Sequence, residues 1–357
     1  MKVGILGGGQ LAKMLAIAAK PLNIEVICVD PTPNCCAQQV ADVLHVVYED
    51  TDAIIQYFQG VDCITIETEN LPFEAVEAIA NHFPIYPSLE SIRITQDRKL
   101  EKNLLKKLAI PTVVFQAIPD WDHLYDFVTR STTAIILKTC QGGYDGKGQY
   151  VIQDMDDAKS AWDQLKNYPL IAEQYCQFDA EVSIIAVRSR SGKIAFYPLT
   201  ENIHRGGILR QSTAPINNKH LTLQAQEYAE SLMTHFDYVG VMAIEFFVKN
   251  NNLLVNEIAP RVHNSGHWTI EGAQTSQFKN HLCAILDLPL GSTEALGYST
   301  MLNIISEQPD SLPSMPGVYP HIYGKEARPN RKLGHITIHA HDESKMNELV
   351  AQTQTYL

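Results

Sequence analysis

The chain has 357 residues, of which 45% are hydrophobic, so it is long enough to bury two or three cores. It carries 28 lysines and arginines against 40 acidic residues, and the net charge of −12 argues against binding to a nucleic-acid backbone. No apolar run approaches the roughly 18 residues that span a bilayer, and no charged leader precedes the first strand-like segment, so we expect a cytoplasmic protein with no membrane partner.

The first ninety residues alternate short apolar runs with helical patterns. Apolar residues recur at helical spacing after the first run, and a second helix is expected over 72–83. This order is typical of a parallel sheet covered by helices, and we therefore expect a Rossmann-like domain over residues 1–97. The strands are expected at MKVGILG (1–7), IEVICVD (24–30), VLHVV (43–47) and VDCITIE (61–67).

A glycine-rich turn, GILGGGQLAKML, joins the first strand to the first helix. Gly7, Gly9 and Ala12 fit the pattern G-x-G-x-x-G/A, and Asp30 ends the next strand at the distance expected of a ribose-binding acid. By itself this turn favours a nicotinamide-dependent dehydrogenase. A helix N-terminus behind a glycine turn attracts any phosphate, however, so a ribonucleotide monoester fits equally well.

The pattern changes near Arg98, where a charged helix, DRKLEKNLLKKL, ends at the proline of AIPT. We place a domain boundary there and expect an α+β domain of mostly antiparallel sheet over 98–297, with a lid subdomain at about 112–172. A small C-terminal domain, 298–357, contains the strand GHITIHA and a short polar helix. The strands expected in the larger domain are TAIILKT, QYVI, PLIAEQY, EVSIIAV, KIAFYPL, VMAIEFF and LLVNEIA.

Two acidic residues, Glu245 and Glu257, are expected to face each other. If their strands form a hairpin that is symmetric about Asn251, residue 249 pairs with 253 and 247 with 255, and the two glutamates share one face. Like charges directly opposite on a sheet are destabilising, so a divalent cation such as Mg²⁺, with Mn²⁺ as an alternative, would neutralise them. The other interpretation is that one glutamate pairs with an arginine and the other is solvated.

A second cluster, LKTCQGGYDGKGQYVI, places Lys138 at a strand end ahead of a glycine-rich loop. The loop is no Walker A motif, because Gly148 stands where Ser or Thr is required and no helix follows. It can fold its backbone N–H groups and Lys147 over a polyphosphate as a lid, or it can be a simple mobile turn.

Several motifs together resemble the ATP-grasp superfamily and, within it, the N5-carboxyaminoimidazole ribonucleotide synthase family of purine biosynthesis. They cover nearly the whole chain, from the opening GGGQLAKML to NRKLGH near the C-terminus. Between these lie GGYDGKGQYVI, EQYCQFDAEVSII, YPLTENIHRGGILRQS, YVGVMAIEFF and NEIAPRVHNSGHWT.

The resemblance implies roles for individual residues in ATP binding. Glu245 and Glu257 match the magnesium ligands, and Ala259 stands where many ATP-grasp enzymes have an asparagine, which leaves Asn256 or water as a further ligand. The implied ATP contacts are Arg98, Lys138, Gly143, Tyr144, Asp145, Gly146, Lys147, Gly148, Gln149, Glu173, Gln174, Tyr175, Cys176, Glu181, His204, Asn256 and Glu257.

The reaction that the resemblance implies is an ATP-dependent carboxylation. Bicarbonate attacks the γ-phosphate to give carboxyphosphate, which carboxylates the exocyclic amine of 5-aminoimidazole ribonucleotide, and a homodimer is common in the family. Tyr144, Arg210 and Lys332 match catalytic positions near bicarbonate and the amine. The implied substrate contacts are Gly9, Gln10, Leu11, Glu69, Arg261, His263, Asn264, Ser265 and Arg328.

Some alternatives stay open from the sequence. Either Glu67 or Glu69 binds the substrate, or both meet solvent, and Lys325 and Arg331 belong to a solvated basic face. A dehydrogenase would leave the two facing glutamates and the lid loop unexplained. A nucleotide sensor without catalysis, and a related enzyme that uses formate and glycinamide ribonucleotide, are the other candidates.

Overall fold

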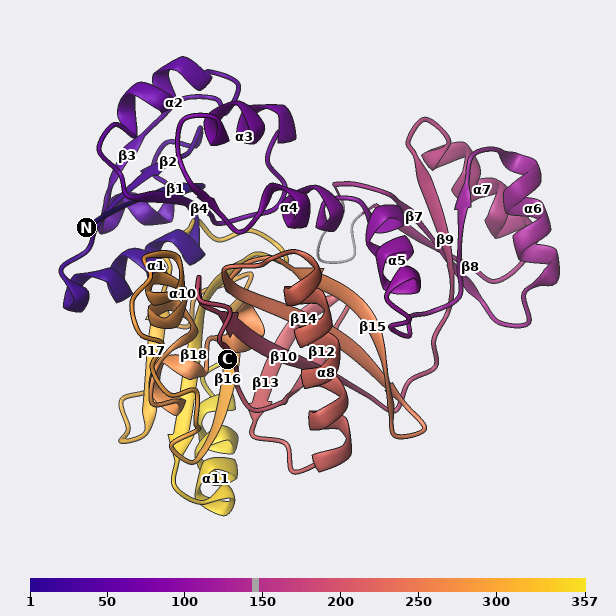
Figure 1. Ribbon diagram of the computed structural model, residues 1–357. Helices are drawn as coiled ribbons and strands as arrows, with labels where there is room; N and C mark the ends of the chain where they lie inside the picture. The colour runs from indigo at the N-terminus through magenta and orange to yellow at the C-terminus, as the bar shows by residue number, and fades with distance from the viewer. Residues whose placement is uncertain (143–147) are drawn as a thin grey trace.

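Three β-sheets organise this computed structural model, which describes residues 1–142 and 148–357 (Figure 1). The first is a parallel sheet of five strands in the order β3-β2-β1-β4-β5, which confirms the Rossmann-like expectation. Its elements are β1 (Lys2–Leu6), α1 (Gln10–Ala19), η1 (Lys20–Leu22), β2 (Glu25–Val29), η2 (Cys36–Gln39), β3 (Asp42–Leu44), α2 (Thr51–Tyr57), β4 (Cys63–Ile66), α3 (Phe73–Ala80), β5 (Ile85–Tyr86) and α4 (Leu89–Thr95).

The second sheet is small and antiparallel, in the order β6-β9-β7-β8. Helices α6 and α7 pack together, and their apolar side chains share one buried cluster with the sheet. We call this sheet with its two helices the lid subdomain. Its elements are β6 (Phe115–Ile118), α6 (Trp121–Arg130), β7 (Ile135–Thr139), β8 (Gln149–Ile152), α7 (Met155–Leu165) and β9 (Leu170–Gln174). Helix α5 (Arg98–Lys107) precedes it.

The third and central sheet has nine strands, all in antiparallel pairs. The strands of the C-terminal segment belong to it, because β16 pairs with β13. Its strands are β10 (Ala180–Arg188), β11 (Ile194–Phe196), β12 (Thr200–Arg205), β13 (Ile208–Ala214), β14 (Gly240–Lys249), β15 (Asn252–Ala259), β16 (Tyr298–Ile305), β17 (Val318–Ile322) and β18 (Lys332–Ala340).

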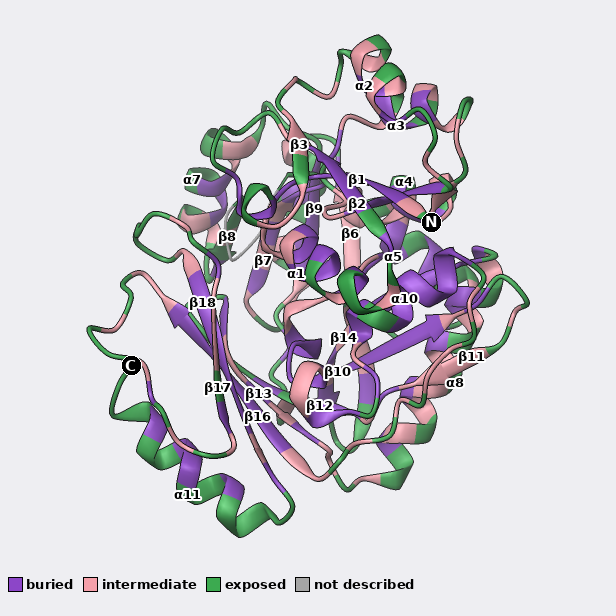
Figure 2. Cartoon of the chain, turned by 90° about the vertical axis from the view of Figure 1, so that its left-hand side faces the viewer, coloured by how far each residue is buried: buried purple, intermediate pink, exposed green. Residues whose placement is uncertain are grey.

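Alternation along the central strands produces two apolar faces. On β10 and β14, Ile184 and Ile244 belong to the cluster under α8, whereas Ile185 and Ala243 belong to the cluster shared with α1 and α10. Figure 2 shows these strands largely buried, while α11 alternates buried and exposed residues. The covering helices are α8 (Lys219–His235), η3 (Asn264–Gly266), α9 (Thr269–Gly272), α10 (Gln277–Ile285) and α11 (Glu343–Gln354). Among the described residues no helix is long and apolar enough to cross a membrane.

A buried histidine ties the N-terminal sheet to the central one. His281 on α10 accepts the N–H of Val241 at Nδ1, at 3.0 Å, so its Nε2 carries the proton and faces Thr65 Oγ1 at 2.8 Å. Burial lowers the pKa of His281 to about 4. A second proton on this ring would point at the Val241 N–H, so the interface needs the neutral form.

We expect the stability contributed by His281 to depend on pH. Because the folded pKa lies below the unfolded value of 6.5, the contribution is complete above pH 6.5 and is lost as the pH falls toward 4. The difference in unfolding free energy between the wild type and His281→Gln should shrink by up to about 1.4 kcal/mol per pH unit in that window. Urea unfolding of both proteins at pH 7.5 and 5.5 measures it. A difference that is the same at both pH values would contradict the assignment.

Candidate active site

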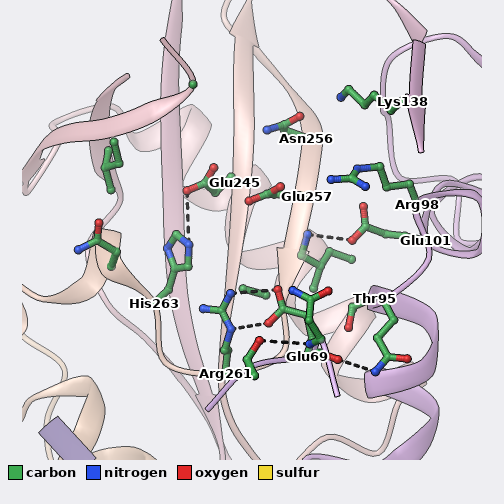
Figure 3. A pocket seen from close by; sticks show the side chains of 18 of the residues that line it. Glu69, Thr95, Arg98, Glu101, Lys138, Glu245, Asn256, Glu257, Arg261 and His263 are labelled. Atoms are coloured by element: carbon green, nitrogen blue, oxygen red, sulfur yellow. Dashed lines mark hydrogen bonds and ion pairs between the residues drawn. The ribbon is translucent and has the colours of Figure 1, made fainter. Parts of the chain in front are cut away.

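A cavity of about 650 Å³ lies where side chains of all three sheets meet. The N-terminal domain contributes Gln10 and Glu69, and the lid subdomain contributes Lys138. The central sheet contributes Glu245 and Glu257, which point toward one another in Figure 3. Sixteen of the residues singled out from the sequence line it: Gln10, Leu11, Glu69, Arg98, Lys138, Gln149, Glu173, Glu181, His204, Glu245, Asn256, Glu257, Arg261, His263, Asn264 and Lys332.

The two glutamates are directly opposite, as predicted, but the predicted register of the hairpin is wrong. The turn has two residues, Asn250 and Asn251, both with positive φ, and Lys249 therefore pairs with Asn252. A β-bulge then shifts the register by one residue, so that Phe246 still pairs with Val255 but Glu245 pairs with Glu257. The prediction still paired Glu245 with Glu257, because it assumed a turn of three residues. The structure has a turn of two residues and carries the extra residue in β15.

The electrostatics of this pair fit a bound cation. Burial, and then the Glu257 charge, raise the pKa of Glu245. Nε2 of His263 lies 3.7 Å from Glu245 Oε1, and one ligand atom from each of Glu245, Glu257 and His263 falls within 4.8 Å of the others. Burial, followed by the Arg261 charge, holds the pKa of His263 well below its usual range, so the ring is neutral. The two carboxylates supply the hard oxygen donors that suit Mg²⁺ or Mn²⁺. Nδ1 of His263 accepts the Ser265 N–H at 3.3 Å, so the neutral ring carries its proton on Nε2, which faces Glu245.

Two lysines, a half-buried one in the lid subdomain and a fully buried one on α5, approach the same cavity. Lys138 Nζ donates to Glu173 Oε2 at 2.7 Å, and Lys102 Nζ lies 3.9 Å from Glu173 Oε1. Burial would raise the pKa of Glu173, but the Lys102 and Lys138 charges hold it below its usual value. The glutamate therefore stays ionised and fixes Lys138 beside Arg98 at the cavity wall (Figure 3).

Two further predicted nucleotide contacts form a pair on the central sheet. His204 on β12 is hydrogen-bonded through Nδ1 to Glu181 of β10 at 2.5 Å. Burial lowers the pKa of His204, but the hydrogen bond to Glu181 and the charges of Glu245, Glu181 and Glu257 together outweigh it, and the net shift is upward. Glu181 is thus held in place with one oxygen engaged.

The glycine turn holds a carboxylate of the chain itself. The N–H groups of Gly9 and Leu11 donate to the two oxygens of Glu67, at 2.5 and 3.2 Å, and that of Gly8 donates to Asp30 at 2.7 Å. A Cβ on Gly9 would lie 2.2 Å from Glu67 Oε1, so glycine is needed here for the approach of an acid. Asp30, which follows β2, therefore has a structural role in holding the turn at Gly8. A substrate phosphate would reach the Gly9 and Leu11 amides only by displacing Glu67.

Glu67 and Glu69, the two acids that follow β4, both have hydrogen-bond partners within the protein. Glu69 forms a double hydrogen bond with the Arg261 guanidinium, Nε to Oε2 at 2.5 Å and Nη2 to Oε1 at 3.0 Å. Burial would raise the pKa of Glu69, but Arg261 brings it below its usual value. The pair carries no net charge, and it forms the wall of the cavity near His263 (Figure 3).

Several predicted site residues lie elsewhere in the described part of the chain. Ser265 is fully buried, and its hydroxyl lies 2.9 Å from Nδ1 of His263. Arg328 is exposed and pairs with Glu326, and Arg210 is absent from the described cavity lining. Gly9, Gly148, Gln174, Tyr175 and Cys176 are also not among the described lining residues. The predictions for Gly143, Tyr144, Asp145, Gly146 and Lys147 lie outside the described residues.

The sequence reasoning missed two charged residues of the cavity, Glu101 and Lys102. The two residues are 3% and 1% exposed, although the many charged residues of their helix predict a solvent-exposed helix. Burial raises the pKa of Glu101 to about 8, against the lowering effect of Lys102. The available signal was the four-residue spacing of Glu101 with Leu105, which puts the acid on the apolar face of the helix.

Models of three protein families match successive parts of the chain. The ribonucleotide synthetase preATP-grasp domain matches residues 1–96, the ATP-grasp domain 103–278, and the phosphoribosylaminoimidazole carboxylase C-terminal domain 299–349. These matches confirm the expected combination of a Rossmann-like pre-ATP-grasp domain, an ATP-grasp domain and a small C-terminal segment.

Whole proteins are similar over their full length. N5-carboxyaminoimidazole ribonucleotide synthase of Pseudomonas aeruginosa is 41% identical over 100% of this chain and 99% of its own. The N5-carboxyaminoimidazole ribonucleotide synthetase structure from Thermus thermophilus is 42% identical, with a TM-score of 0.94 over 99% of this chain and 98% of that one. A synthase structure from Aspergillus clavatus, in complex with ADP and 5-aminoimidazole ribonucleotide, is 33% identical, with a TM-score of 0.91 over 99% of this chain and 98% of that one. The chain belongs to the ATP-grasp family of N5-carboxyaminoimidazole ribonucleotide synthases.

Proposed function

We propose that this protein carboxylates 5-aminoimidazole ribonucleotide to N5-carboxyaminoimidazole ribonucleotide, with ATP and bicarbonate as co-substrates, and releases ADP and phosphate. One observation carries the proposal: a facing carboxylate pair, a half-buried lysine and a charge-neutral Arg–Glu wall meet in one cavity. Glu245 and Glu257 suit a cation on polyphosphate, Lys138 suits the phosphates, and the wall made by Arg261 and Glu69 suits a small polar substrate.

The chemistry proceeds in two transfers. A bicarbonate oxygen forms a bond to the γ-phosphorus as the bond to the ADP oxygen breaks, which gives carboxyphosphate. The exocyclic amine then forms a bond to the carboxyl carbon, phosphate leaves with the C–O bonding pair, and the amine loses a proton. The first step supplies the leaving group that bicarbonate lacks.

The described residues position these partners and offset their charge. Glu245 and Glu257 would hold Mg²⁺ or Mn²⁺, which lowers the charge of the polyphosphate when bound. Lys138, fixed by Glu173, stabilises charge on the transferring phosphoryl group. Lys332 lines the cavity near Glu245, where it suits the bicarbonate or carboxyphosphate oxygens.

Phosphate release from Mg·ATP and bicarbonate, with and without 5-aminoimidazole ribonucleotide, tests the proposal. We expect strong stimulation by the ribonucleotide and the carboxylated product in the mixture. Turnover only with formate and glycinamide ribonucleotide would assign the related reaction instead, and ATP binding without turnover would indicate a nucleotide sensor. A homodimer, which the family resemblance supports, is tested by sedimentation velocity.

A further inference from the structure

The bulge in β15 decides which side chain faces Glu245. With the two-residue turn alone, the register would continue from Phe246–Val255 to Glu245–Asn256. Glu257 would then lie opposite Ile244, on the apolar face under α8. Asn256 is the extra residue, and its insertion moves Glu257 to the cavity face. The facing acidic pair therefore exists only while this bulge is kept.

The bulge lies on an edge strand, where a register slip meets little resistance from a neighbouring strand. Side chains from α5 take the place of that neighbour. Lys102 Nζ donates to the carbonyl of Asn256 at 2.8 Å and also contacts that of Val255 at 3.4 Å. Glu101 Oε2 accepts the N–H of Ile258 at 3.0 Å. The two residues thus hold the backbone on both sides of Glu257.

The segment after α5 completes this contact. Thr112 Oγ1 donates to the Val255 carbonyl at 2.7 Å and accepts from Lys102 Nζ at 2.9 Å. The Val255 N–H donates to the carbonyl of Pro111 at 2.8 Å, and Thr112 and Val255 form an isolated parallel bridge. We call Glu101, Lys102 and Thr112 the bulge clamp.

The bulge clamp is also joined to the nucleotide side of the cavity. Lys102 lies between the bulge carbonyls and Glu173, and the other oxygen of Glu173 holds Lys138. Burying the charge of Lys102 costs desolvation free energy, and a solvent-exposed lysine would support the same helix without that cost. The burial of Lys102 therefore indicates that its ammonium group is needed at this place, between the bulge carbonyls and Glu173.

We propose that Glu101 and Lys102 are positioning residues, which fix the β-bulge at Asn256 and so keep Glu257 opposite Glu245 for metal binding. The inference rests on the proposed function, because it takes these two glutamates as the metal ligands. Its content is separate, since it assigns the geometry of the pair to two side chains of α5 that are not themselves the metal ligands.

The test is Mn²⁺ binding to the ADP-saturated protein, followed by EPR, which needs no turnover. We expect Lys102→Met to weaken Mn²⁺ binding by about tenfold or more, as is typical when support for a metal ligand is lost. Lys106→Met, on the exposed side of the same helix, is the matched control and should bind Mn²⁺ as the wild type does. Thermal melting shows that each variant is folded.

A second pair of variants keeps the proposal falsifiable if Lys102→Met does not fold. Glu101→Gln retains an oxygen acceptor for the Ile258 N–H and should bind Mn²⁺ almost as tightly as the wild type. Glu101→Leu removes this acceptor and should bind Mn²⁺ more weakly. In the Glu257→Gln background, Lys102→Met or Glu101→Leu should have no further effect on Mn²⁺ binding.

The outcomes separate the two claims. Weak binding by Glu257→Gln but normal binding by folded Lys102→Met and Glu101→Leu would overturn the bulge clamp and leave the metal assignment standing. Equal binding by the wild type and Glu257→Gln would overturn both. The proposal would also be overturned if Lys102→Met or Glu101→Leu weakened Mn²⁺ binding as much in the Glu257→Gln background as in the wild type. That result would show that Glu101 and Lys102 support the structure in general and do not act through Glu257.

Discussion

Replacing Glu257 by glutamine is expected to lower phosphate release stimulated by 5-aminoimidazole ribonucleotide by about 10³-fold or more, because losing a metal ligand removes several kcal/mol of transition-state stabilisation. The thermal stability of this variant should not fall with its activity. Glu257 lies directly opposite Glu245, and in the absence of metal the substitution removes the repulsion between them. We therefore expect a thermal midpoint without metal that is equal to or above that of the wild type.

Phosphate release and thermal melting, with and without Mg²⁺, measure the two effects. Glu201→Gln is the matched control, because Glu201 is an exposed acid on β12 of the same sheet, and it should leave both quantities unchanged. Activity close to that of the wild type in Glu257→Gln would refute the metal assignment. A strongly lowered midpoint would show that Glu257 is instead a structural partner.

Replacing Lys138 by methionine is expected to lower kcat/KM for ATP by about 100-fold, the loss found when one charged hydrogen-bond donor to a transferring group is removed. The same substitution leaves Glu173 buried, with Lys102 as a more distant partner at 3.9 Å. Breaking a buried ion pair costs about 3 kcal/mol, so the lid subdomain should also become less stable.

A double variant separates the two consequences. Lys138→Met with Glu173→Gln removes both charges, and it should recover part of the thermal midpoint while kcat/KM for ATP stays low. Recovery is incomplete because Lys102 loses the Glu173 carboxylate. Lys159→Met, an exposed lysine on α7 of the lid subdomain, should change neither. Recovery of ATP use in the double variant would mean that Lys138 acts only by neutralising Glu173.

Most of the N-terminal fold follows from local pattern, because β1, β2 and β4 are short, continuous apolar runs and α1 repeats apolar residues at helical spacing. Strand β12 is different. Its burial alternates, and His204 on it faces a polar cavity, so TENIHR has no apolar run to identify it. Strands β14 and β15 line the same cavity but contain apolar runs, so it is the missing run, and not the site, that hides β12 from the sequence.

In the candidate site too, some features were predicted from the sequence and others were not. Residue types carried by motifs, such as Lys138, Glu245, Glu257 and Arg261, were found from the sequence, and the structure brings all four to one cavity. The contacts of Glu67 with the Gly9 and Leu11 amides were not, because they join residues more than fifty positions apart.

The sequence by itself determined the family, the parallel N-terminal sheet, the antiparallel larger sheet and the identity of the acidic pair, because each depends on short motifs or on periodicity along one strand. Only the tertiary structure decided that the bulge lies at Asn256, that Glu101 and Lys102 are buried against it, and that β16 joins the C-terminal segment to the central sheet. Register on an edge strand and burial on a charged helix are set by the surfaces packed against them, and those surfaces come from distant parts of the chain.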